Sequence, residues 1–199
     1  MELLLPALLV LQLLCFVGGY PSGAPTGACE DMLPRHSGVL PQSSPAPYAL
    51  HTDTRTFQPG QPITVTISGP EYRGVLLEAR TGSNMNTLGN WELPPPDTKF
   101  LECSGNPQGA VTHSNTNLKG NSTAYRWIAP NSTSPVYFIA TVAQQRTVFW
   151  VNVKSTTLAR EKPGGLGLAV HASAGMTREK SLLLPVIGFL ILQVLGGPQ

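Results

Sequence analysis

The chain has 199 residues, of which 41% are hydrophobic and only 12% are charged, about half the charged fraction of a typical soluble domain. The formal net charge of +2 comes from scattered residues, so the electrostatic basis for binding nucleic acid is missing. The apolar residues gather at the two ends, and the roughly 150 residues between them suffice for one core and are too rich in β-branched and aromatic side chains for disorder.

The N-terminal residues 1–19 are predicted to be a signal peptide. Leu3–Val17 is an apolar, leucine-rich run, and small residues and then a polar Pro-Ser-Gly segment follow it, which is the order that signal peptidase recognises. Val17 and Gly19 suit the two positions that require small side chains, so cleavage is expected before Tyr20. The alternative is a first helix buried in the fold.

The cysteines agree with export. Cys15 lies in the predicted signal peptide, so the mature chain keeps Cys29 and Cys103. An even pair in an exported protein indicates a disulfide, whereas the absence of a CxxC motif or a Cys/His cluster argues against a zinc site. Since residues 24–47 are rich in Pro, Ser and Gly, a bond from Cys29 would tie this segment to the domain.

The middle of the chain reads as strands separated by turns. Ile63–Ser68 alternates strictly between apolar and hydroxyl side chains, as a half-buried strand does, and no window shows sustained helical periodicity. Further strands are predicted at Gly74–Arg80, Tyr125–Trp127, Val136–Val142 and Thr147–Val153, and weaker ones at Pro47–Thr52, Leu88–Leu93, Lys99–Cys103 and Ala110–His113. The last two of the stronger strands are apolar on both faces, as expected for central strands. About seven to nine short strands of this kind predict an all-β, antiparallel β-sandwich.

Two glycosylation sequons begin at Asn121 and Asn131, on either side of the predicted strand Tyr125–Trp127. The alternative is that both are unmodified surface asparagines. Glycans at these positions would screen the two ends of that strand. A protein partner is therefore expected on the far side, at the long polar loop Thr81–Asn90.

After the predicted domain, residues 20–154, the sequence turns into a low-complexity stalk at residues 155–174. An apolar tail, Leu182–Leu195, follows and is 14 residues long, short of the ~20 that a helix needs to cross a bilayer. No Lys or Arg follows this tail to hold a cytoplasmic end in place.

Small residues, a polar spacer and a short apolar tail form the signal for a glycosylphosphatidylinositol anchor. The order here predicts a lipid anchor at Ser173 or Ala174 and removal of residues 175–199. A short single membrane helix or a plainly secreted chain are the alternatives.

The sequence shows no catalytic constellation. GxSxG, HExxH and a Walker loop are absent. His36, His51 and His113 could converge on a metal but are interpreted as scattered surface or half-buried residues, and Asp97 and Glu102 as solvated charges at strand ends rather than a carboxylate pair. We therefore predict no enzyme activity, no cofactor and no metal site.

The large aromatic side chains are interpreted as core rather than as a ligand platform. They are Trp91, Trp127, Phe149 and Trp150.

The assembled pattern resembles the reeler domain. The resembling stretches are Tyr20–Pro25, Cys29, Met32–His36, Phe57–Gly60, Arg73–Arg80, Cys103, Val111–Ser114, Lys119, Trp127–Pro130, Val136–Thr141 and Phe149–Trp150. The resemblance covers about Tyr20–Val153 and implies an extracellular immunoglobulin-like sandwich with a disulfide between Cys29 and Cys103. It also implies kinship with single-domain defence proteins suggested to be antimicrobial, and with ferric-chelate reductases, whose additional redox modules this chain lacks.

The leading hypothesis is a non-enzymatic recognition or innate-defence protein displayed at the cell surface, with an extracellular protein or a microbial glycan as its ligand. A secreted antimicrobial effector is the second, and an ectodomain related to ferric-chelate reductases the third.

Overall fold

The computed structural model describes residues 19–132 and 134–161. The predicted signal peptide up to residue 18, the anchor positions Ser173 and Ala174, and the tail 175–199 lie outside the described residues. Within the described part of the chain, no helix has the length and apolar character needed to cross a bilayer.

The described residues form eleven strands and one short 3-10 turn. In chain order they are η1 (Thr26–Ala28), β1 (Ala49–Thr52), β2 (Thr56–Phe57), β3 (Pro62–Ser68), β4 (Gly74–Arg80), β5 (Asn90–Trp91), β6 (Thr98–Cys103), β7 (Asn106–His113), β8 (Ser122–Ile128), β9 (Tyr137–Gln145), β10 (Val148–Lys154) and β11 (Ala159–Arg160).

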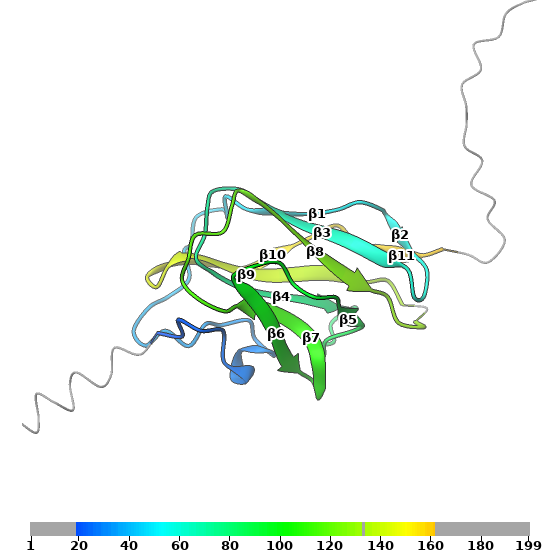
Figure 1. The fold of residues 1–199 in the computed structure, drawn as a ribbon, viewed down its shortest axis with the longest axis horizontal. Coiled ribbons are helices and arrows are strands. Elements are labelled where there is room, and N and C mark those ends of the chain that lie inside the picture. The colour runs from blue at the N-terminus through cyan, green and yellow to red at the C-terminus, as the bar shows by residue number, and fades with distance from the viewer. Residues whose placement is uncertain (1–18, 133, 162–199) are drawn as a thin grey trace, which may run out of the picture. The chain divides into compact units, whose positions relative to one another are not determined.

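Nine of these strands form two sheets that pack face to face (Figure 1). One sheet has the order β1-β3-β8-β5 and the other the order β10-β9-β4-β7-β6, with antiparallel pairing throughout both. The predicted antiparallel sandwich is confirmed. The short pair β2–β11, which is parallel, was not predicted.

The alternation in the sequence determines which side of β3 faces the core. Ile63, Val65 and Ile67 are at most 1% exposed, while the hydroxyl residues between them are partly exposed. Full pairing of β3 with β8 opposes Ile63 to Trp127, so the apolar face continues across the sheet. A shift of one residue would turn this face to solvent, which fixes the register.

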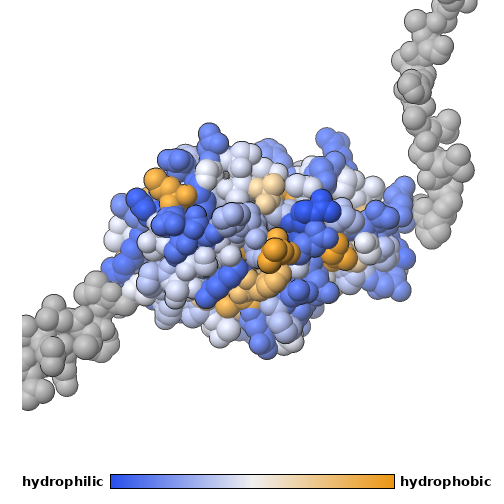
Figure 2. Space-filling model, viewed as in Figure 1, coloured by the Kyte–Doolittle hydropathy of each residue, from blue (hydrophilic) through white to orange (hydrophobic). Residues whose placement is uncertain are grey.

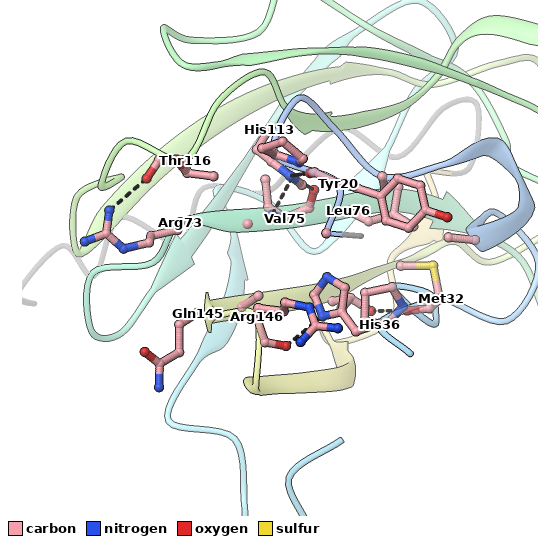
Figure 3. Close-up of a pocket in the computed structure, with 18 residues that line it drawn as sticks. Tyr20, Met32, His36, Arg73, Val75, Leu76, His113, Thr116, Gln145 and Arg146 are labelled. Carbon is pink, nitrogen blue, oxygen red and sulfur yellow. Dashed lines mark hydrogen bonds between the residues drawn. The ribbon is translucent and has the colours of Figure 1, made fainter. Parts of the chain in front are cut away.

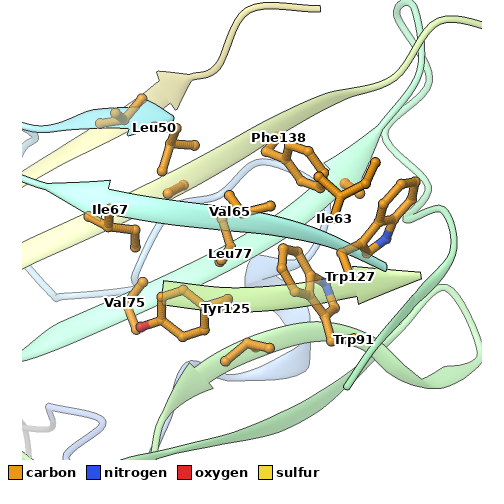
Figure 4. Close-up of a cluster of buried hydrophobic side chains, with 14 of the residues drawn as sticks. Leu50, Ile63, Val65, Ile67, Val75, Leu77, Trp91, Tyr125, Trp127 and Phe138 are labelled. Atoms are coloured by element: carbon orange, nitrogen blue, oxygen red, sulfur yellow. The ribbon is translucent and has the colours of Figure 1, made fainter. Parts of the chain in front are cut away.

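The core between the sheets is rich in aromatic side chains (Figure 4). The ring of Phe138 on β9 contacts those of both Trp91 and Trp127, with ring centroids 5.8 and 5.2 Å away. Together with Phe149 and Trp150, which are 1% and 8% exposed, these residues confirm the prediction that the large aromatics are core.

One prediction about strand position is wrong. β10 lies at an edge of the five-stranded sheet, although its apolar faces suggested a central strand. The N-terminal segment provides the missing cover: Gln42 donates a backbone hydrogen bond to the Phe149 carbonyl, and the indole of Trp150 donates one to the Ser44 carbonyl. Apolar residues on both faces therefore indicated burial correctly but not a central place in the sheet.

The predicted boundary between domain and stalk at residue 154 also differs from the structure. Leu158 is fully buried and exchanges two backbone hydrogen bonds with Val136. β11 then pairs with β2, and the Glu161 amide donates to the Phe57 carbonyl. The folded domain thus extends at least to Glu161. The low-complexity composition of this segment could not reveal that it is folded, because one buried leucine and backbone pairing suffice to hold it in place.

The crossover from β7 to β8 is held by a buried lysine. Lys119 is 4% exposed, and its ammonium group donates hydrogen bonds to the carbonyls of Arg73, Asn115 and Asn117 at 2.8, 3.1 and 2.9 Å. Its backbone also pairs with Tyr72 in an isolated bridge. The side chain therefore satisfies three carbonyls of a turn that has few backbone partners of its own.

We expect Lys119→Met to lower the free energy of unfolding by roughly 2–3 kcal/mol, because three partly buried carbonyls lose their charged donor while the apolar stem is kept. Urea unfolding followed by tryptophan fluorescence measures this change. Lys154→Met, which removes an exposed ammonium group lying 5.2 Å from the Tyr137 ring, serves as the control and should cost less than about 1 kcal/mol. Equal losses in the two variants would contradict the role given to Lys119.

Candidate ligand-binding cavity

The segment before β1 crosses the outer face of the five-stranded sheet and is attached to it at intervals. The Ala24 amide donates to the Thr112 hydroxyl at 2.8 Å, and the Thr141 hydroxyl donates to the Met32 carbonyl at 2.6 Å. At Gly23 the backbone has a φ of +127°, and an added Cβ would lie 3.0 Å from the His113 carbonyl. Only glycine allows so close an approach in this conformation.

This attachment creates a second, smaller core outside the sandwich. Ala28 and Met32 from the segment pack on Leu76 and Ile139, which project from the outer face of the sheet. Cys29 is joined to Cys103 by a disulfide with a Cα–Cα distance of 5.6 Å. The predicted function of this bond, tying the N-terminal segment to the domain, matches its place in the structure.

A buried ion pair lies beside the disulfide. Glu78 is fully buried, and it accepts hydrogen bonds at 2.9 and 2.7 Å from Arg80, which also donates to the Cys29 carbonyl. Burial raises the pKa of Glu78 to about 7, while the charge and hydrogen bonds of Arg80 oppose this rise. Glu78, Cys29 and Cys103 are one cluster of potential metal ligands in the described residues, but the two sulfurs are bonded to each other.

Next to this second core, a cavity of about 510 Å³ opens between the N-terminal segment and the sheet (Figure 3). Its volume falls in the usual range for small-molecule sites. The apolar part of its lining is formed by Ala24, Ala28, Met32, Val75, Leu76 and Ala143. Figure 3 shows Arg73, Thr116 and Gln145 at one end of the cavity and Met32 and Leu76 toward the other.

Two of the histidines that the sequence left scattered, His36 and His113, line this cavity. His113 Nε2 lies 2.7 Å from the Tyr20 carbonyl, and its Nδ1 accepts a hydrogen bond from the Val75 amide at 3.3 Å. Because a carbonyl oxygen only accepts, the contact with Tyr20 places a proton on Nε2 of His113. His36 Nδ1 lies 2.7 Å from the Arg146 carbonyl, which favours protonation at Nδ1 and leaves Nε2 free of that contact.

The pKa of His36 is lowered chiefly by burial, and the positive charges of Arg146 and His113 lower it further, although the hydrogen bond to the Arg146 carbonyl opposes them. A lowered pKa means that the fold favours the neutral ring, so protonation in the unfolded chain comes first as the pH falls. His36 thus contributes stability above about pH 6.5 that is lost below it.

We expect the free energy of unfolding of the unaltered protein to fall relative to that of His36→Gln between pH 7.5 and pH 5.5. Urea unfolding at several pH values measures both. Glu78 contributes a slope of opposite sign, with stability that rises on acidification, but it is present in both proteins and cancels in the difference. Parallel pH profiles would rule out the assigned role of His36.

Arg146 supplies the other notable group of the cavity. Its Nε is buried and has no hydrogen-bond partner among the described residues, and its Nη2 reaches the Ser37 carbonyl only at 3.4 Å. Arg73, at the far end, is exposed and donates to the Thr116 carbonyl at 2.8 Å. None of the 18 residues that line the cavity is acidic, so the fixed charges of the lining are the two guanidinium groups of Arg73 and Arg146.

The remaining residues singled out in the sequence do not join this site. His51 Nε2 lies 2.9 Å from Ser68 Oγ, but the pair is on the outer face of β1 and β3, and no carboxylate in the described residues hydrogen-bonds to His51. A nucleophile needs such a base and a third group to orient it. Asp97 accepts hydrogen bonds from Asn115 and Asn117 instead of pairing with Glu102.

The sequons flank β8 as expected, and Asn121 and Asn131 are both exposed. The expected place of the loop Thr81–Asn90 is wrong. The Leu88 carbonyl accepts a hydrogen bond from the Trp127 indole, and Asn90 pairs with Ile128, so the loop ends beside the second sequon and not on the far side of the molecule. The loop takes this position because the two-residue strand β5 pairs with β8. No local pattern in the sequence predicted that pairing.

The cavity itself was therefore not predicted from the sequence. Its basic side chains come from positions 36, 73, 113 and 146, which a linear motif cannot connect. The one available signal was the density of small residues and prolines before Tyr48, which is compatible with close packing on a sheet but equally with a loose loop.

Comparisons with known proteins place the chain. Residues 27–164 match the profile described as "Reeler domain". "Putative defense protein 3" of Antheraea mylitta is 39% identical over 73% of this chain and 90% of its own length, and "Putative defense protein Hdd11" of Hyphantria cunea is 38% identical over 74% and 92%. Ferric-chelate reductase 1 of Mus musculus is 33% identical over 80% of this chain, but that match spans only 27% of the reductase.

Among solved structures, the reeler domain of human F-spondin has a TM-score of 0.51 and 21% identity, and the match covers 62% of this chain and 95% of that domain. This likeness supports the sandwich fold, while the sequence matches establish kinship. The chain belongs to the reeler domain family.

Proposed function

We propose that this protein is an extracellular defence protein that acts by binding a ligand in the cavity between its N-terminal segment and the five-stranded sheet, and not by catalysis. The cavity carries the proposal: it joins an apolar lining to cationic side chains and brings no nucleophile–base pair together. The defence-protein relatives, which match over about nine tenths of their length, support the same biological role.

Display at the cell surface is part of the proposal. A lipid anchor at Ser173 or Ala174 and glycans at Asn121 and Asn131 would hold and shield the domain, with a microbial glycan or an extracellular protein as its partner. On the face in Figure 2, hydrophobic residues form separate patches among hydrophilic ones. That face offers no broad apolar surface, which favours the cavity as the place of binding.

The direct test uses the full chain expressed in a eukaryotic host. Whole bacteria and immobilised cell-wall glycans are incubated with the unaltered protein and with Ala143→Leu, which places extra bulk in the cavity, and growth inhibition is measured in parallel. Binding that Ala143→Leu abolishes supports the proposal. Binding that the variant leaves intact contradicts it, and killing of bacteria would favour the secreted effector.

Localisation is tested separately by treating intact cells with a phospholipase that cleaves the anchor. Release into the medium supports lipid anchoring, while protein that stays on the membrane favours a short helix.

A further inference from the structure

The charged side chains that line the cavity are positive, which favours a negatively charged ligand. Two guanidinium groups, Arg73 and Arg146, and two imidazoles, His36 and His113, line it without a single carboxylate. In a partly desolvated site, charges of one sign are weakly screened and raise the local concentration of the opposite ion. A neutral sugar would use the charge of neither guanidinium group.

The apolar part of the lining adds a second requirement for the ligand. Leu76, Met32 and Ala28 are at most 3% exposed and line the part of the cavity that lies against the second core, while the partly exposed Ala24, Pro34 and Ala143 supply the apolar area that a ligand can cover. The exposed Arg73 and Gln145 lie at the opposite end. A ligand that fills the cavity must therefore carry an apolar portion as well as a charged one, since burial of apolar area supplies most of the binding energy.

Arg146 indicates where the charged group would lie. Its Nε–H is a buried donor without a partner in the described residues, and such donors are rare because each one costs free energy. An anionic oxygen is the acceptor that a guanidinium binds most strongly. His36 is attached to the same residue through the Arg146 carbonyl, so its ring lies close to this position.

We infer that the cavity binds an amphipathic anion, an acyl chain with a carboxylate or phosphate head group, with the head at Arg146 and His36 and the chain along Leu76, Met32 and Ala28. This inference rests on the proposed function and specifies its ligand. A free fatty acid and a phosphorylated lipid both have the chemistry required. The titration described next distinguishes them.

The test is calorimetric titration of the full chain with dodecanoate and dodecyl phosphate, each below its micelle concentration, and with dodecyltrimethylammonium and butanoate as controls for charge and chain. We expect both long-chain anions to bind, the long-chain cation to bind at least tenfold more weakly, and butanoate not to bind. Tighter binding of dodecanoate identifies a fatty acid as the source, and tighter binding of dodecyl phosphate a phosphorylated lipid. Equal affinity for the cation and the anions would overturn the inference.

Variants locate the site. Arg146→Gln and Ala143→Leu should each weaken binding of the anions at least tenfold. Arg126→Gln, which removes an exposed arginine paired with Glu92 on the other sheet, should leave it unchanged. If Arg146→Gln does not fold, His36→Gln takes its place, because the His36 ring lies beside the proposed head group, and its expected effect is a weakening of at least twofold. Unchanged affinity in a folded Arg146→Gln, or in His36→Gln where it is the substitute, would overturn the inference.

The inference and the proposed function can fail separately. Binding to bacteria that Ala143→Leu abolishes, without any binding of acyl anions, would preserve the function and refute the inference. Binding of acyl anions that Ala143→Leu abolishes, without any binding to bacteria or cell-wall glycans, would do the reverse.

Discussion

Replacement of both Cys29 and Cys103 by serine is expected to lower the free energy of unfolding by about 4.5 kcal/mol, the chain-entropy value for a bond that closes a separation of 74 residues. Equilibrium urea unfolding measures the loss. The same variant should lose the cavity, since Cys29 is the covalent link between the N-terminal segment and the sheet. Limited proteolysis should then cut between residues 24 and 47 under conditions in which the unaltered protein stays intact.

Thr141→Val is the matched control. It removes another attachment of the same segment, the hydrogen bond from the Thr141 hydroxyl to the Met32 carbonyl, and keeps the side-chain volume. Its expected cost is about 1 kcal/mol. If the serine variant lost no more than Thr141→Val and resisted proteolysis equally well, the bond would not be what holds the segment in place.

The strands were predictable because their information is local. In β3 the alternation of apolar and hydroxyl residues fixes the buried face, and the turn residues Gly69 and Pro70 fix its end. β2 and β11 escaped prediction because two-residue strands carry no periodicity; backbone pairing to a neighbouring segment alone defines them.

The cavity was not predictable because its contacts are distant in sequence. His36 meets Arg146 across 110 residues and His113 meets Tyr20 across 93. Before the fold is known, a histidine in a proline-rich segment has no visible partner. The same reason explains why the histidines looked scattered: their common feature is a surface of the sheet that only the attached N-terminal segment turns into a site.

In β4, the N-terminal segment that covers the outer face of the sheet changes how the alternation of charged and apolar residues must be interpreted. Glu78 and Arg80 alternate with Leu77 and Ala79, which is the pattern of a strand with one face in solvent. In the structure this outer face is covered, so both charged residues are buried and paired. A buried pair of this kind costs more to break than an exposed one, because the remaining charge stays in a medium that solvates it poorly.

Arg80→Met is accordingly expected to lower the free energy of unfolding by about 3–5 kcal/mol at pH 8. The variant keeps the apolar stem but leaves the Glu78 carboxylate without its counter-charge and the Cys29 carbonyl without its donor. Urea unfolding at pH 8 measures the loss. Arg126→Met, which breaks the exposed pair with Glu92, should cost no more than about 1 kcal/mol and controls for the general effect of removing an arginine.

The pH dependence separates the lost counter-charge from lost packing. The pKa of Glu78 is raised to about 7 even beside Arg80, and without Arg80 it rises further. A raised pKa contributes stability at low pH that is lost as the pH rises, so the variant suffers most at pH 8. At pH 5.5 the carboxyl of Glu78 is neutral in both folded proteins, and the difference in unfolding free energy between them should shrink to the cost of the hydrogen bonds.

Adding Glu78→Gln to Arg80→Met should restore part of the stability at pH 8, because no buried charge then lacks a partner. A loss that is the same at both pH values, and that Glu78→Gln does not relieve, would mean that Arg80 acts only by filling space.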